Sequence, residues 1–397
     1  MTALALRSFT ATSAIGRGLD ATLVSLRAQR SGLAPCRFES VALETCVGEV
    51  AGVDEVRLPR ELSEFDCRNN RLAWLAMAQD GFTAAVAQCV ARHGAHRIGV
   101  FLGTSTSGIL ETEIAYRHRD PQSGGLPEGF HYRGAHNTFS LAAFTKRALD
   151  LTGPAVVISC ACSSSAKVFA SARRAIAAGL IDAAVVGGVD SLCLTTLYGF
   201  HALQLVARTP CRPFDAARDG ISIGEAAAFA LLERPKNDLD STGVLLLGTG
   251  ESSDAYHMST PPPDGRGARE AMLQALAAAR LNAGDIGYIN FHGTGTPSND
   301  AAEGLAVASV LGKDVPGSST KGATGHTLGA AGALEAVICA LALKANLMPA
   351  GVSTTQVDPT IPVSYLRENR SARLARVMSN SFGFGGSNCC LILALAG

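Results

Sequence analysis

Short continuous apolar runs alternate along the chain with longer segments of helical character. Ala155 to Ser159 (AVVIS) and Ala183 to Val189 (AAVVGGV) have the length and composition of strands, and we interpret AVVIS as a buried strand. Ser163 to Ala178, which lies between them, is predicted to form a helix. A strand, a helix and a second strand in this order favour a parallel sheet of the α/β class.

The second half of the chain repeats this pattern. Ile286 to Phe291 (IGYINF) is a short apolar strand, Thr327 to Leu343 is an Ala- and Leu-rich helix, and Cys389 to Leu395 is a final strand. Cys162 and His326 each follow a turn of small residues and precede an Ala-rich helix. This parallel indicates an internal pseudo-repeat.

The polar stretch Asp238 to Gly243 (DLDSTG) is our predicted boundary between the two halves, residues 1–242 and 243–397. A chain of 397 residues, 47% of them apolar, can bury a large core. The N-terminus reads as a first strand rather than a secretion signal. We expect no membrane span, because Glu335 and Lys344 interrupt the helix after His326.

Charge and cysteine content narrow the function classes. The 34 basic and 34 acidic residues give zero net charge, so no global basic field for nucleic acid exists. Eleven cysteines are scattered, odd in number and without Cys-x-x-Cys pairs. Reduced thiols in a cytoplasmic protein without a metal site are the simplest interpretation.

Cys162 is the first candidate for chemistry, because it lies where the predicted strand meets the predicted helix. Unpaired N–H groups and the positive end of the helix dipole favour a thiolate there, and a thiolate attacks carbonyl carbon. The alternative is a buried, inert thiol. The junction alone does not decide between the two.

Two histidines occupy similar junctions. His292 ends the IGYINF strand and is followed by the turn Gly293 to Pro297, while His326 follows Ser319 to Gly325 and opens the next helix. A positive helix end keeps an imidazole neutral, so its N–H can donate to an oxygen that gains negative charge. Two such histidines beside Cys162 favour catalysis over a structural role.

The segment Asn380 to Asn388 (NSFGFGGSN) is a glycine-rich loop that either forms a plain hairpin turn or aims an N–H at an oxyanion, with Phe384 over a pocket. It does not match a phosphate loop, and neither it nor Gly293 to Gly295 fits a dinucleotide fingerprint. No nucleotide cofactor is therefore expected.

These four segments, in this order, closely resemble the elongating β-ketoacyl-[acyl-carrier-protein] synthases, which are condensing enzymes of the thiolase superfamily. Further segments that look like this family are Arg212 to Asp215, Arg218 to Gly220, Gly224-Glu225 and Glu251 to Met258. The resemblance implies a thiolase-like, duplicated α/β/α/β/α fold of five layers with the active site between the halves.

The resemblance also implies the role of each reactive side chain. Cys162 matches the acylated nucleophile, and His292 and His326 match the pair that binds the malonyl thioester carbonyl and supports decarboxylation. Lys321 matches an active-site lysine and Glu335 its acidic partner.

Further matches concern the walls of the site. The backbone N–H groups of Cys162 and Phe384 match an oxyanion hole, with Phe384 as a mobile gate. Thr294 and Thr296 match threonines that contact pantetheine.

The implied activity is that of an acyltransferase: a Cys-bound acyl chain condenses with malonyl-[acyl-carrier protein], carbon dioxide leaves, and the chain grows by two carbons. Substrates arrive on the phosphopantetheine of acyl carrier protein, and neither a resident cofactor nor a metal is implied. The irregular segment Ile109 to Arg147 looks like the part that caps the pocket and meets a second subunit. The resemblance implies a dimer, either a homodimer or a heterodimer with a ketosynthase-like subunit.

Two arginine pairs, Arg68 with Arg71 and Arg173 with Arg174, are candidate contacts for the acidic carrier. We interpret each of them as part of a solvated helix face.

Two other functions are weighed against the condensing enzyme. A non-catalytic chain-length partner subunit usually lacks the nucleophilic cysteine, which Cys162 supplies. A thiolase or starter-type condensing enzyme normally has a Cys-His-Asn or Cys-His-Cys set, which His326 contradicts. Cys160, where threonine is usual, and Gly322-Ala323, where Ser-Met is usual, leave fatty-acid, polyketide and aryl polyene pathways open.

Overall fold

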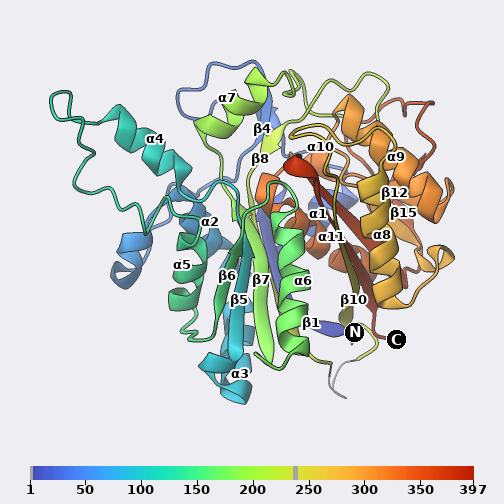
Figure 1. Cartoon of the computed structure of the whole chain (residues 1–397), viewed down its shortest axis with the longest axis horizontal. Coiled ribbons are helices and arrows are strands. Elements are labelled where there is room, and N and C mark those ends of the chain that lie inside the picture. The colour runs from blue at the N-terminus through green and yellow to red at the C-terminus, as the bar shows by residue number, and fades with distance from the viewer. Residues whose placement is uncertain (1–2, 236–239) are drawn as a thin grey trace.

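The computed structural model describes residues 3–235 and 240–397. Within these residues one hydrogen-bonded sheet of 12 strands runs through the molecule in the order β14-β12-β11-β16-β17-β10-β1-β9-β7-β5-β6, with β2 paired on β1. Figure 1 shows β5, β6 and β7 of this sheet side by side. The strands of the first half are β1 (Leu4–Ser13), β2 (Gly16–Arg17), β5 (Ile98–Gly103), β6 (Ala155–Ile158), β7 (Ala183–Asp190) and β9 (Ala226–Glu233). Those of the second half are β10 (Val244–Ser253), β11 (Tyr288–Asn290), β12 (Pro316–Ser318), β14 (Ser364–Tyr365), β16 (Arg376–Gly383) and β17 (Ser387–Leu395).

The two halves of this sheet have the same topology. In the first, β5 pairs parallel with β6 and β7, and β7 pairs antiparallel with β9, which lies beside β1. In the second, β11 pairs parallel with β12 and β16, and β16 pairs antiparallel with β17, which lies beside β10. The predicted internal repeat is therefore confirmed. The halves join where Leu4–Leu6 of β1 pairs with the start of β10.

Helices form three layers around the two half-sheets. The central layer consists of α6 (Ser164–Ala177) and α11 (Ala331–Ala345), which contact each other and strands of both halves. Outer helices α2 (Arg68–Met77), α3 (Phe82–His93) and α5 (Ser140–Ala148) cover the first half-sheet. On the other side α8 (Arg266–Ala279) covers β10 and β17, with α9 (Pro297–Leu311) packed against α8. This is the expected five-layered α/β/α/β/α arrangement.

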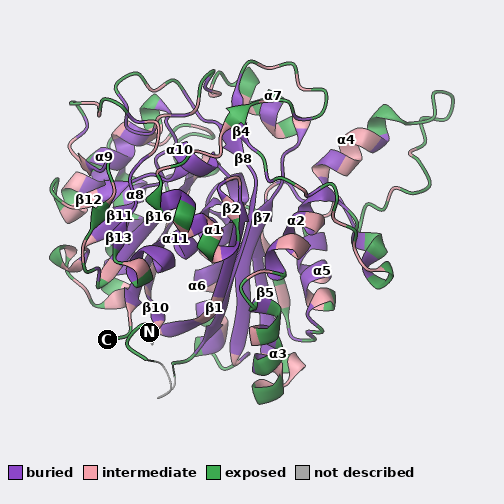
Figure 2. Cartoon of the chain, turned by 180° about the vertical axis from the view of Figure 1, so that it is seen from behind, coloured by how far each residue is buried: buried purple, intermediate pink, exposed green. Residues whose placement is uncertain are grey.

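The helix after His326 is more apolar than the sequence analysis allowed. Leu328–Ala345 has the length and composition of a membrane span, with a mean hydropathy of 1.7, despite Glu335 and Lys344. However, 89% of it is buried inside the protein, and Figure 2 shows α11 enclosed by other elements. It is a core helix, apolar all round because both half-sheets cover it.

The interpretation of AVVIS as a buried strand is wrong. β6 is the last strand in the sheet order, none of its residues is fully buried, and Val156 is 37% exposed. Burial of a strand depends on which elements cover it, and an edge strand can have the same apolar sequence pattern as a central strand.

The interpretation of the arginine pairs as solvated helix faces is wrong for two of the four residues. Arg68 and Arg173 are buried, and Arg173 donates from Nη2 to the Leu247 carbonyl oxygen (3.1 Å). Arg174 is largely exposed, and Arg71 is half-buried in an ion pair with Asp66. Helical spacing does not reveal whether an arginine side chain points to solvent or to a buried partner.

The segment Ile109 to Arg147, expected to be irregular, begins with α4 (Ile109–Arg117) and ends within α5 (Ser140–Ala148), so only the turns between these two helices are irregular. α4 and these turns project from the layered body of the protein (Figure 1). The predicted boundary Asp238 to Gly243 falls partly on residues 236–239, which lie outside the described residues. It remains a prediction, with β9 ending at Glu233 and β10 beginning at Val244.

We predict that the closeness of the two central helices depends on Gly332. A Cβ added there would lie 2.6 Å from the Ala166 backbone nitrogen and 2.7 Å from its Cβ. Gly332→Ala is therefore expected to lower the free energy of unfolding by roughly 1–3 kcal/mol through overpacking. The same change at the exposed Gly199 of α7 (Leu194–Ala202), where a Cβ meets nothing within 4 Å, should raise it by up to about 1 kcal/mol. Urea denaturation measures both, and equal effects at the two positions would contradict the close-packing argument.

Candidate active site

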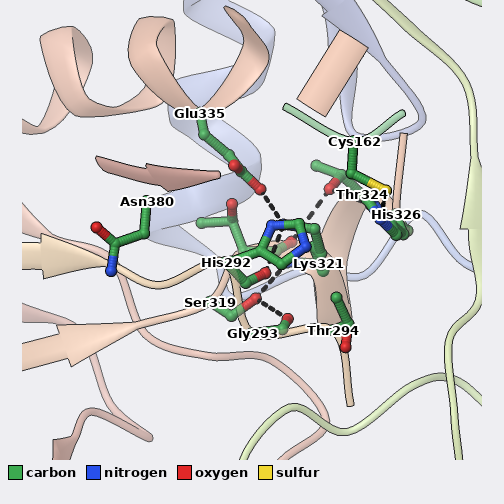
Figure 3. A network of polar contacts seen from close by, with 12 residues as sticks. Cys162, His292, Gly293, Thr294, Ser319, Lys321, Thr324, His326, Glu335 and Asn380 are labelled. Carbon is green, nitrogen blue, oxygen red and sulfur yellow. Dashed lines mark hydrogen bonds and ion pairs between the residues drawn. The ribbon is translucent and has the colours of Figure 1, made fainter. Parts of the chain in front are cut away.

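The predicted reactive residues converge at the carboxyl ends of strands from both halves. Cys162 lies between β6 and α6, His292 lies just after β11, and His326 follows β12 and the short helix α10 (Lys321–Thr324). Figure 3 shows Cys162 and His326 side by side, with His292 and Lys321 next to them. Residues more than 100 positions apart thus form one buried cluster, as predicted.

Cys162 is held in a tight turn. The preceding Ala161 has a left-handed backbone (φ 55°), and Cys160 and Cys162 form an isolated bridge on either side of it. The Cys162 sulfur lies 3.0 Å from His326 Nε2 and accepts a hydrogen bond from the Phe384 backbone N–H. A strained turn of this kind holds a side chain in one direction. Here it points the sulfur at an imidazole and an amide.

The expectation of a resting thiolate at Cys162 is wrong. Burial raises the pKa of this thiol to about 12, although Lys321 and the Phe384 N–H lower it. The sequence pattern shows the helix end but not the complete removal of water, and here desolvation outweighs the favourable dipole. A thiol with such a pKa needs a base before it can act as a nucleophile, and His326 Nε2 lies within hydrogen-bond reach of this one.

Both histidines are neutral, as predicted, but for a different reason. The pKa values of His292 and His326 lie well below 6.5, because both rings are buried and Lys321 carries a nearby positive charge. His326 does not open the long helix directly, since the 3₁₀ turn Leu328–Ala330 separates it from α11. The ring centroids of the two histidines are 5.3 Å apart, so both imidazoles reach the same space.

Lys321 fixes the tautomer of His292. Its buried ammonium forms an ion pair with Glu335, donates to the His292 carbonyl oxygen (2.5 Å) and lies 3.4 Å from His292 Nδ1 (Figure 3). An ammonium can only donate, so Nδ1 accepts and Nε2 carries the ring proton. Burial raises the pKa of Glu335 to about 7, and Lys321 opposes this rise.

Two acidic residues that the sequence analysis missed support the His292 turn. Glu303 accepts from the backbone N–H groups of His292 (2.8 Å) and Gly293 (2.7 Å), and Asp300 accepts from the Thr294 N–H (3.0 Å). Both carboxylates are buried on α9, one turn apart. Acidic residues three positions apart in an Ala-rich helix are a signal that could have found them.

A pocket connects the cluster to the surface. Thr294 and Thr296 line it, with their hydroxyl oxygens 2.9 Å apart, and so do Phe384 and the three reactive side chains. The other lining residues are Phe200, Leu205, Ile221, Asp254, His257, Ser259–Pro261, Ser298, Asn299, Phe382, Gly383, Gly385, Gly386 and Asn388. The predicted site residues that do not line it are Lys321 and Glu335, which lie behind His292.

We predict that His292 and His326 stay neutral where an ordinary histidine gains a proton. Because their pKa values are lowered, both imidazoles should remain unprotonated as the pH falls through 6.5 and should gain protons only at lower pH. Nitrogen NMR of labelled histidines measures this. Lys321→Met should raise both pKa values, whereas Lys344→Met, at the exposed end of α11, should leave them unchanged. Protonation of either ring near pH 6.5 in the unmodified protein would contradict the assignment.

Two family models match the chain. They are "Beta-ketoacyl synthase, N-terminal domain" over residues 59–238 and "Beta-ketoacyl synthase, C-terminal domain" over residues 244–355. Among curated proteins, Nodulation protein E of Rhizobium meliloti is 34% identical over 389 residues, which cover 95% of each chain. The 3-oxoacyl-[acyl-carrier-protein] synthase 2 of Coxiella burnetii is 30% identical over 406 residues and 96% of each chain.

Solved structures agree with these matches. A chain from the structure of the ketosynthase ApeO in complex with its chain length factor ApeC, from Xenorhabdus doucetiae, superposes with a TM-score of 0.90 at 38% identity, and the match covers 100% of this chain and 98% of that chain. A β-ketoacyl synthase from Burkholderia phymatum gives a TM-score of 0.87 at 29% identity, with complete coverage of both chains. The chain therefore belongs to the β-ketoacyl synthase family, and it is an acyltransferase of the elongating ketosynthase type with a thiolase-like fold.

Proposed function

We propose that the protein extends an acyl chain on Cys162 by decarboxylative condensation with malonyl-[acyl-carrier protein], and that each predicted site residue has the role its position suggests. One observation carries this proposal: the Cys162 sulfur, two neutral imidazoles and the Phe384 N–H meet in one pocket. A nucleophile, two hydrogen-bond donors and an amide are the groups this reaction requires.

In the first step the Cys162 sulfur attacks the thioester carbonyl carbon of an acyl carrier. His326 Nε2, 3.0 Å away, takes the thiol proton, and the N–H groups of Cys162 and Phe384 hold the oxyanion. The tetrahedral intermediate then collapses, the C–S bond to the carrier breaks, and the departing sulfur receives the proton. The result is an acyl-enzyme and a free carrier thiol.

In the second step malonyl thioester enters the same pocket past Thr294 and Thr296. The Nε2–H of His292 donates to the carbonyl oxygen of this thioester, and so does the Nε2–H of His326 once the single ring proton of His326 has moved from Nδ1 to Nε2. Carbon dioxide leaves, and the bonding electrons form an enolate. The enolate carbon attacks the acyl-Cys162 carbonyl, the C–S bond to Cys162 breaks, and the departing Cys162 sulfur takes up one proton from water to restore the thiol. The product on the carrier is two carbons longer.

We predict that the two half-reactions separate in histidine variants. His292→Ala should lower condensation about 10²- to 10³-fold by removing a donor to the enolate, yet Cys162 should still become acylated. His326→Ala should lower condensation as well, and it should also slow acylation because it removes the base 3.0 Å from the sulfur. Intact-mass measurement follows the acyl adduct with acyl carrier protein and its loss with malonyl carrier protein. Cys162→Ala is the control that should show neither, and normal elongation in either histidine variant would refute the assigned role.

We also propose that this chain binds a second ketosynthase-like subunit to form a dimer. β6 ends the sheet with a partly exposed edge, and Tyr116 and Tyr132 are exposed on the projecting segment that begins with α4. The structure of the ketosynthase ApeO with its chain length factor ApeC contains a chain that is 38% identical to this one. A heterodimer is therefore our preferred form over a homodimer, and the eleven free thiols favour a reducing cytoplasmic setting.

If a chain length factor is the partner, the chain alone should elongate poorly and the co-purified pair should elongate well. A panel of acyl carriers, tested with and without the co-expressed partner, measures this, and light scattering gives the assembly. Full activity of a stable homodimer would establish the other form.

A further inference from the structure

The backbone of His326 is fixed by a neighbouring strand. The His326 N–H donates to the Ser222 carbonyl oxygen (2.7 Å), and the Gly224 N–H donates to the His326 carbonyl oxygen (3.0 Å). Ile223 and Gly224 form β8, which pairs in parallel with β4 (Cys46–Gly48). The place of the His326 imidazole therefore depends on where β8 lies.

A buried ion pair holds the end of β8. Glu225, the next residue, is 0% exposed and accepts two hydrogen bonds from Arg68, which is 2% exposed: Nε to Oε2 (2.9 Å) and Nη2 to Oε1 (2.7 Å). The same carboxylate accepts from the backbone N–H groups of Val50 and Leu192, both at 2.9 Å. Glu225 thus connects β8 to the start of α2 and to two other segments.

The other side of His326 is tied to the same framework. Asp190, two residues before Leu192, accepts from the Gly329 N–H (2.6 Å). It also accepts from the N–H groups of Ser105 (2.7 Å) and Thr106 (2.9 Å). The segment from Asp190 to Leu192 therefore holds the chain around His326 in two ways. The Leu192 N–H binds Glu225, at the end of the strand β8 that lies beside His326, and the Asp190 carboxylate binds the Gly329 N–H, which follows His326.

Stability alone does not account for this ion pair. Removing two charges from water is costly, and well-packed apolar residues of similar size are often as stable. A bidentate Arg–carboxylate pair, however, fixes direction as well as distance. This contact is therefore suited to holding β8, and with it His326, in one position.

We propose that Arg68 and Glu225 form a positioning pair that sets the distance between His326 Nε2 and the Cys162 sulfur, and thereby the rate of condensation. This inference rests on the proposed function. Neither residue lines the pocket, so both act through the backbone around His326.

Asp54 provides a matched control. It accepts two hydrogen bonds from Nη1 of the same arginine, both 2.8 Å long, but its side chain is 70% exposed, and within residues 3–235 and 240–397 it makes no hydrogen bond or ion pair to β8. An exposed carboxylate such as that of Asp54 contributes little to holding the Arg68–Glu225 pair in place. Asp54→Asn therefore changes the charge around Arg68 without releasing β8.

The experiment compares Glu225→Gln, Asp54→Asn and the double variant Arg68→Met/Glu225→Met, which removes both charges together. Glu225→Gln and the double variant should lose roughly 10²-fold in kcat, with the KM for malonyl carrier protein little changed, because displacement of a reacting group by about 1 Å costs that much. Asp54→Asn should stay within about twofold of the unmodified enzyme. Thermal unfolding reports the fold of each variant.

A second readout does not depend on elongation. The rate at which iodoacetamide alkylates Cys162 at neutral pH, followed by intact mass, should fall in the Glu225 variants and not in Asp54→Asn, because the base 3.0 Å from the sulfur has moved. A folded double variant with unchanged kcat and unchanged alkylation would overturn the proposal, even if Glu225→Gln itself fails to fold. If the unmodified protein shows no elongation, the proposed function fails, and the alkylation comparison still tests the positioning pair.

Discussion

The ammonium of Lys321 is the charge on which the rest of the site depends. It lies between the carboxylate of Glu335 and the ring of His292, with all three buried. Removing charges from water is costly, and removing one partner of such a pair leaves the other uncompensated. In return, the same positive charge lowers the pKa values of Cys162, His292 and His326 and sets the tautomer of His292. The charge of one buried cation thus influences the protonation of three reactive groups.

The duplicated sheet explains why distant residues meet. β6 and β12 occupy equivalent places in the two half-sheets, and Cys162 and His326 follow them; β11, which precedes His292, is the equivalent of β5. Phe384 follows β16, whose equivalent β7 ends at Asp190, the residue that holds the loop after His326. Each half of the chain therefore supplies reactive groups at the ends of its own strands. It also supplies residues that hold the reactive groups of the other half in place. Ligand sites at the carboxyl ends of strands are a general property of α/β sheets.

Local patterns sufficed to predict much of this. The strand ends at Ile158 and Asn290 are short-range features, and the reactive residues that follow them could be found in the sequence. The family resemblance, and not spacing, supplied the pairing of Lys321 with Glu335. The predictions that failed concern properties that depend on the complete fold. These are the exposure of β6, the burial of Arg68 and the raised pKa of Cys162. Each depends on which distant elements cover a residue, and no sequence window contains that information.

The protonation states argue for an order in the reaction. While Cys162 holds its proton, His326 Nε2 faces a hydrogen-bond donor and is suited to accept from it. In the proposed reaction acylation leaves an uncharged thioester on Cys162, so His326 Nε2 no longer faces a hydrogen-bond donor. The ring proton of His326 can then move from Nδ1 to Nε2, from where it donates alongside that of His292. The site is thus suited to proton removal before acylation and to enolate stabilisation after it. In the proposed reaction, acylation before decarboxylation therefore agrees with where the protons lie, since malonyl thioester that enters the free enzyme meets only one fixed donor, His292.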